Sequence, residues 1–148
     1  MPNYKKQKKY IDMNERLSLA LKNEFYYEAI FIEFAILEDR TKSMLRHAKF
    51  SESTCDGKLN EKLNTIKNSA KFHDEYVRKH ITNELLSNIH NWKNARNKLN
   101  HELAECEYSN DYIKKIALDG SKISKKLSSK STLVNKYFDK TIKSILDR

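Results

Sequence analysis

The chain has 148 residues, a length typical of one domain that can bury a substantial core. Its 29 lysine and arginine residues against 20 aspartate and glutamate residues give a formal net charge of +9, which favours polyanions such as nucleic acid as partners. Two glycines, one proline and 33% charged residues favour long helices and argue against a fold of many short strands. The composition therefore predicts a single all-α domain.

The cysteines and the apolar runs exclude several classes of protein. Cys55 and Cys106 lack Cys-x-x-Cys spacing, so neither a disulfide framework nor a zinc site is indicated. The most apolar run, residues 25–37, contains Glu28 and Glu33 and is shorter than the roughly 20 residues that a membrane span needs. The basic N-terminus is not followed by an uninterrupted apolar segment, so no secretion signal is predicted. We expect a soluble, cytoplasmic protein with no membrane partner.

The first third of the chain predicts an arm and a long helix. Residues 1–11 are rich in lysine, and we expect a basic, flexible arm that precedes one helical domain over residues 12–148. A first helix is predicted over residues 12–49, with a break near Lys22 or Asn23. Apolar residues cover nearly the whole circumference of its centre, so it should be buried on more than one side. Either the core of the same chain or a dimer interface would explain that pattern.

The remainder of the chain predicts three more helical stretches. Residues 50–58 read as a loop, and a shorter helix follows, with an apolar face formed by Leu59, Leu63, Ile66 and Ala70. A third helical stretch is predicted over residues 76–105. Ser109 then offers an N-cap for a last long helix that ends near residue 146. The expected fold is a bundle of four to five helices with long first and last members.

The last helix carries much of the positive charge. Residues 111–148 contain ten lysine and arginine residues against four aspartates. Lys115, Lys122, Lys126 and Lys130 lie along one stripe of this helix. The stripe indicates either a polyanion-binding face or a solvated surface.

The segment Asn94-Ala95-Arg96-Asn97-Lys98-Leu99-Asn100-His101 has the side chains that phosphate chemistry needs. Arginine holds phosphate oxygens by paired, charge-assisted hydrogen bonds, and histidine accepts and returns a proton near neutral pH. Five residues apart on a helix, Arg96 and His101 point about 140° apart, so they converge only toward a cleft between their faces. The alternative is that Arg96 pairs with a surface carboxylate while His101 makes an ordinary hydrogen bond.

The segment Arg96-Asn97-Lys98-Leu99-Asn100-His101 resembles the Arg-polar-x-x-x-His signature of the HEPN superfamily, small helical bundles found in bacterial toxins, abortive-infection systems and RNA-cleaving CRISPR effectors. The order of a long first helix, a variable connection, the motif on a late helix and a long last helix is similar to that family across most of the chain. The resemblance therefore implies a HEPN-like bundle.

The resemblance implies metal-independent endoribonuclease activity in defence or growth arrest, in which a ribose 2'-hydroxyl attacks the adjacent phosphate. His101 is then the catalytic general base or acid, Arg96 stabilises charge on the phosphate oxygens, and Asn97 orients His101 or binds a phosphate oxygen. Such sites combine two copies of the motif, so a homodimer is expected. An antitoxin or another regulatory partner is also expected, while no metal and no cofactor are.

Other residues complete the expected site. Glu33 of the first helix is a candidate support, because its apolar neighbours would bury it, and Arg96 is its candidate partner. Leu103 stands where nucleotidylated HEPN proteins carry tyrosine, which disfavours that form of regulation. The residues expected to bind RNA are Asn100, Lys93, Lys98, Lys115, Lys122 and Lys126.

Two functions besides a nuclease remain open from the sequence. The chain also fits a non-catalytic HEPN-like module that binds RNA or a nucleotide through its basic last helix. A helical protein-interaction module without any nucleic-acid role is the other alternative. Loss of cleavage on His101→Ala with the fold intact separates a nuclease from a binding module, and salt-dependent retention of RNA separates a binding module from an interaction module.

Overall fold

The computed structural model describes residues 4–105 and 107–147, and every regular element in these ranges is helical. In chain order the elements are α1 (Tyr4–Lys22), α2 (Tyr26–His47), α3 (Glu52–Cys55), α4 (Leu59–Asn68), the 3-10 turn η1 (Ala70–Phe72), α5 (Glu75–His80), α6 (Asn83–Glu102) and α7 (Asn110–Leu146). The predicted all-α class is confirmed. Among these described helices, none is long and apolar enough to cross a membrane.

Helix α1 begins earlier than the sequence predicts. It starts at Tyr4, so residues 4–11 are helical where a flexible arm was expected, and residues 1–3 lie outside the described ranges. The physical reason is visible at Tyr10, whose hydroxyl group donates a hydrogen bond to Ser128 of α7. The guanidinium group of Arg40 in α2 also lies 4.7 Å from the centre of the Tyr10 ring. These contacts hold the basic segment against the bundle.

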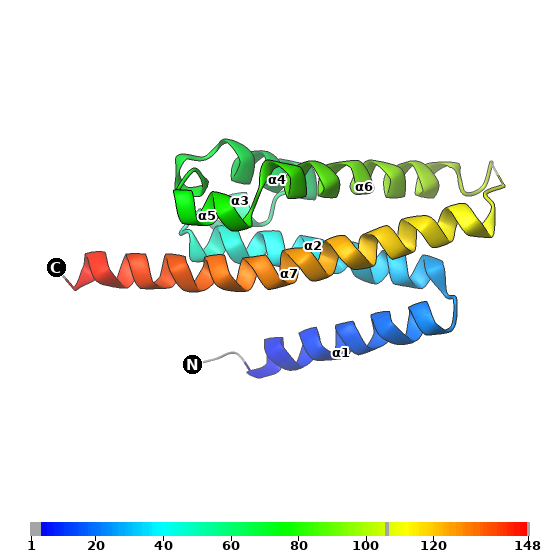
Figure 1. The fold of residues 1–148 in the computed structure, drawn as a ribbon, viewed down its shortest axis with the longest axis horizontal. Coiled ribbons are helices and arrows are strands. Elements are labelled where there is room, and N and C mark those ends of the chain that lie inside the picture. The colour runs from blue at the N-terminus through cyan, green and yellow to red at the C-terminus, as the bar shows by residue number, and fades with distance from the viewer. Residues whose placement is uncertain (1–3, 106, 148) are drawn as a thin grey trace.

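The break predicted near residue 22 separates α1 from α2. Asn23 donates a side-chain hydrogen bond to the carbonyl oxygen of Leu19, and the backbone N–H of Phe25 donates to that of Ala20. Glu24 takes a positive φ of 60°, which reverses the chain in very few residues. The two helices therefore form a hairpin instead of one rod (Figure 1).

Helix α2 is the centre of the bundle. It packs most extensively against α7 and also contacts α1, α3 and α4. Figure 1 shows α2 and α7 running alongside each other through the middle of the molecule. The buried side chains of α2 are Ala29, Ile30, Ile32, Glu33, Ile36, Leu37, Thr41, Ser43, Met44 and Leu45. The expected burial on more than one side is thus explained by helices of the same chain.

Local caps divide the rest of the chain more finely than predicted. The single helix expected over residues 76–105 is interrupted before Thr82, whose hydroxyl group accepts a hydrogen bond from the backbone N–H of Leu85 and begins α6. The expected loop over residues 50–58 contains the one-turn helix α3, which Ser51 caps. Ser109 caps α7 as predicted, by accepting from the backbone N–H of Tyr112. Cys55 is a buried, free cysteine whose thiol donates a hydrogen bond to the carbonyl oxygen of Phe50, and Cys106 lies outside the described residues.

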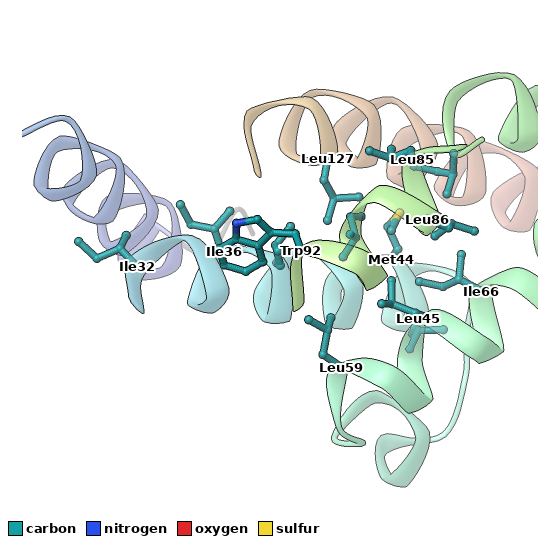
Figure 2. Close-up of a cluster of buried hydrophobic side chains, with 14 of the residues drawn as sticks. Ile32, Ile36, Met44, Leu45, Leu59, Ile66, Leu85, Leu86, Trp92 and Leu127 are labelled. Carbon is teal, nitrogen blue, oxygen red and sulfur yellow. The ribbon is translucent and has the colours of Figure 1, made fainter. Parts of the chain in front are cut away.

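A tryptophan and a glycine set how α6 lies on α7. The indole N–H of Trp92 donates a 2.8 Å hydrogen bond to the carbonyl oxygen of Ile116. Figure 2 shows the same indole beside Ile36 of α2, within the cluster of buried apolar side chains. A Cβ atom on Gly120 would lie 2.7 Å from two ring carbons of Trp92 and would also collide with the carboxyl group of Glu33. Three helices approach closely because residue 120 has no side chain.

We predict that Gly120→Ala destabilises the fold. Alanine gains about 1 kcal/mol in helix propensity over glycine, but overpacking a filled core usually costs about 1–3 kcal/mol, so the net free energy of unfolding should fall. Urea denaturation measures the change. Ser129→Ala, on the exposed face of α7, is the matched control for helix propensity and should leave stability unchanged or slightly raised. A Gly120→Ala variant more stable than the wild type would contradict the close approach.

Candidate functional site

Arg96 lies on the face of α6 that turns toward α2. Its guanidinium carbon lies 3.9 Å from the centre of the Phe34 ring, and its Nη1 atom donates a 3.1 Å hydrogen bond to the side-chain oxygen of Asn97. Burial lowers the pKa of Arg96, and the charge of Glu38 offsets part of that effect. Glu38 itself is paired with the buried Lys62, at an Oε2 to Nζ distance of 2.9 Å. Arg96 is therefore half-buried, oriented by its neighbours and without a carboxylate within 4 Å in the described chain.

His101 lies on a different side of α6. It is exposed in the last turn of the helix, and no side-chain hydrogen bond ties it to any described residue. Five residues along an α-helix correspond to a rotation of about 140° and a rise of about 7.5 Å from Arg96. By helix geometry, the two predicted catalytic side chains of one chain therefore point to different sides of α6.

The other motif residues fall into two groups. Asn97 is half-buried, and its side-chain oxygen accepts the hydrogen bond from Arg96. The sequence predicted instead that Asn97 orients His101 or binds a phosphate oxygen. Asn100 and Lys98 are exposed and are available to a ligand. Lys93 is not, because its side chain is buried and its Nζ atom donates a hydrogen bond to Asn60 of α4. Lys93 is therefore a core contact and not the RNA-binding residue that the sequence predicted.

Glu33 is buried as predicted, but Arg96 is not its partner. The side chain is fully buried against Trp92 and Gly120, and neither carboxyl oxygen has a hydrogen-bond partner among the described residues. Burial raises the pKa of Glu33 to about 9, with a further increase from Asp119 and an opposing effect from Lys125. Glu33 is therefore uncharged at neutral pH and supports the packing of α2, not the orientation of Arg96.

Three of the predicted RNA-binding lysines line one groove between α6 and α7. The groove has a volume of about 550 Å³, and Lys115, Lys122 and Lys126 lie along its α7 side. Lys115 forms an exposed ion pair with Asp119, at 2.7 Å, whereas Lys122 and Lys126 form none with the residues that the structure describes. The sequence predicts these lysines as RNA-binding residues but does not predict the groove, because only the relative placement of two helices creates it.

Comparison of the chain with protein-family models gives no match, and neither the curated proteins nor the solved structures contain a match. The chemistry of the site is therefore inferred from its own residues. Within residues 4–105 and 107–147, no group of three or more histidine, cysteine, aspartate or glutamate side chains is placed to hold a metal ion.

The burial of Glu33 predicts how the free energy of unfolding depends on pH. A carboxyl group with a pKa near 9 in the folded chain and an ordinary pKa of 4.5 when unfolded takes up a proton on folding. The contribution of this carboxyl group to the free energy of unfolding is complete below about pH 4.5. It is lost as the pH rises toward 9, by up to about 1.4 kcal/mol per pH unit. Urea unfolding of wild type and Glu33→Gln across this range measures the difference. Two curves with the same slope would contradict the buried, neutral carboxyl group.

Proposed function

We propose that the protein is a metal-independent endoribonuclease of the HEPN type, which acts in the cytoplasm in defence or growth arrest. The observation that carries this proposal is the environment of Arg96. Its guanidinium group is partly desolvated and held by Phe34 and Asn97, and it forms no direct ion pair within the described residues, while the charge of Glu38, which pairs with Lys62, offsets only part of the desolvation. A partly desolvated cation without a direct ion pair favours an incoming anion, and the paired donors of arginine match a phosphate group.

The exposure of His101 fits a role in proton transfer. In the proposed reaction the ribose 2'-hydroxyl loses its proton to a base and its oxygen bonds to the phosphorus atom. The bond from phosphorus to the 5'-oxygen breaks, and that oxygen receives a proton, which leaves a 2',3'-cyclic phosphate and a 5'-hydroxyl end. A histidine that is free of structural hydrogen bonds can serve as base or acid in these steps.

The divergence of Arg96 and His101 supports a site made by two copies of the chain. Because the two side chains point about 140° apart on α6, Arg96 of one copy and His101 of another can approach one phosphate where a single chain cannot. A two-fold axis through the contact would create two such sites in one homodimer. The ordinary structural alternative, with Arg96 bound to a carboxylate and His101 bound to a neighbour, is not found among the described residues.

An exposed aromatic strip on α2 offers a surface for that contact. Tyr27 and Phe31 lie four residues apart and are 47% and 70% exposed. Phe34, one turn further along the same face, carries the guanidinium group of Arg96. Large aromatic side chains that remain in water are typical of a surface that another protein covers. A second copy seated on this strip would lie beside Arg96.

The positive surface around the motif fits an RNA ligand. Lys98 and Asn100 are exposed on the same turns as Arg96 and His101. The lysines of α7 add positive charge beside the motif helix, and this charge attracts the phosphate backbone without selecting a sequence. RNA is accordingly the proposed substrate.

We predict cleavage of single-stranded RNA and tRNA in the presence of EDTA, with cyclic-phosphate product ends. Arg96→Ala and His101→Ala should each slow cleavage by at least about 100-fold, because one removes the phosphate-binding cation and the other the proton-transfer group. His90→Ala, another exposed histidine of α6, is the matched control and should cleave as the wild type does. RNA that stays intact with the wild type while still binding would favour the non-catalytic RNA-binding module.

A mixing experiment tests whether each site combines Arg96 of one chain with His101 of the other. When Arg96→Ala and His101→Ala proteins exchange subunits freely, half of the dimers are mixed, and each mixed dimer has one site with both residues intact. The mixture should therefore recover about a quarter of the wild-type activity, although each variant alone is inactive. No recovery, with mixed dimers demonstrated by a tag, would place both residues of each site on one chain.

We also predict that Phe31→Glu gives a monomer with little cleavage activity. The side chain is 70% exposed, so its replacement should leave the helical content unchanged while it places a charge in the proposed contact. Light scattering after size exclusion measures the mass, and the RNA assay measures the activity. Leu146→Glu, at a residue that is 79% exposed at the far end of α7, should remain dimeric and active. A dimeric, active Phe31→Glu protein would reject this strip as the interface.

A further inference from the structure

The groove between α6 and α7 has an apolar floor and a basic side. Its floor is formed by Leu85, Trp92 and Ala95 of α6 and by Ile116 and Ile123 of α7. From Leu85 to Ala95 the floor follows α6 for ten residues, a length of about 15 Å or nearly three helical turns. The proposed nuclease uses the motif at the end of α6 and assigns no role to this floor.

The lysines of α7 are spaced to meet a second helix. Lys115, Lys122 and Lys126 lie along the groove at intervals of seven and four residues, which correspond to about 10.5 Å and 6 Å on one face of α7. Carboxylates at intervals of seven and four residues on a docked helix have the same spacing. The opposite side of the groove carries Asn88 and Asn91, which are uncharged. All of the charge therefore lies on the α7 side, where Asp119 pairs with Lys115 and leaves Lys122 and Lys126 without a counter-ion among the described residues.

From these features we propose that the groove binds an acidic amphipathic helix of a partner protein. Apolar side chains at helical spacing would lie on the floor, and carboxylates along one flank would pair with Lys122 and Lys126 of α7. Lys122 and Lys126 carry no ion pair with the described residues, so both are available to a carboxylate. The partner is recognised by the combination of an apolar stripe and a row of negative charge.

The character of the floor favours a peptide over RNA. Bases bind by stacking on exposed aromatic faces, but Trp92 is only 4% exposed. Tyr112, at one end of the groove, is already stacked on Tyr108, with ring centres 5.1 Å apart. The remaining floor is aliphatic, which suits leucine and isoleucine side chains.

The charge of the groove disfavours a second copy of this chain as the occupant. The chain has a net charge of +9, and α7 presents lysines along its exposed face. A row of lysines meeting another basic surface would repel it. An acidic partner, in contrast, gains both from charge and from burial of its apolar stripe.

Trp92 provides a direct probe, because it is the single tryptophan of the chain and lines the groove. The test uses a synthetic helical peptide of about 14 residues, roughly 21 Å long, with leucines on one stripe and glutamates beside it. A scrambled peptide has the same composition but no stripe. We expect the striped peptide alone to shift the emission of Trp92, with a measurable dissociation constant by fluorescence anisotropy.

Charge reversal locates the bound peptide. Lys122→Glu combined with Lys126→Glu should weaken binding of the striped peptide at least tenfold. Lys140→Glu combined with Lys143→Glu changes the net charge equally at exposed positions of α7 outside the groove, and should change binding less than twofold. Circular dichroism checks that both variants are folded.

Three outcomes would overturn the proposal: no binding of the striped peptide, equal binding of the scrambled peptide, or equal weakening by both pairs of substitutions. A single-stranded RNA, tested with the His101→Ala protein so that it stays intact, is the competing ligand. If RNA shifts the emission of Trp92 and the peptide does not, the groove is a nucleic-acid site. Peptide binding does not require RNA cleavage. Absence of peptide binding would therefore not contradict the proposed nuclease, and absence of cleavage would not prevent the peptide-binding test of this groove.

Discussion

The packing of Trp92 against α7 is the contact on which the arrangement of α2, α6 and α7 depends. The indole donates a hydrogen bond to Ile116 and packs where Gly120 leaves room, which fixes both the position and the rotation of α6. That rotation carries Arg96 toward Phe34 and leaves His101 in solvent. It also sets the separation of α6 from α7, and thereby the groove. One buried ring thus determines where the motif and the basic side chains lie.

The half-buried arginines show how unusual the environment of Arg96 is. Arg40 forms an ion pair with Asp39, and Arg78 donates hydrogen bonds to the backbone carbonyl oxygens of Ile66 and Lys67. Arg96 contacts a neutral amide and an aromatic face and forms no ion pair within the described chain, and the charge of Glu38 offsets only part of its desolvation. Desolvating a cation without compensation costs free energy, which the packing of the bundle offsets. A residue kept in this state is suited to an anion from outside the chain.

The sequence predicted the helices better than the contacts between them. Periodicity and the Ser109 cap gave the helical class and the start of α7, because these signals are local. The break before Thr82 was missed, since Ile81 continues the apolar pattern across it. The spacing predicts Arg96 and His101 as site residues, which stays a prediction, but it predicts neither the hydrogen bond of Lys93 to Asn60 nor the packing of Glu33 against Trp92 and Gly120. Those contacts depend on how α4, α6 and α7 meet in space, which no periodicity within one helix encodes.

The pairing of α2 with α7 also governs the order in which the chain can fold. Residues of α2 find their largest partner only in the last helix described, and Tyr10 finds Ser128 across 118 positions of sequence. During vectorial synthesis the face of α2 that packs against α7 therefore remains uncovered until α7 has left the ribosome, although α1, α3 and α4 can cover its other faces earlier. Assembly of the motif, which needs α6 seated on α7, comes equally late. A growing chain would thus acquire any activity of this motif only after α7 has been synthesised.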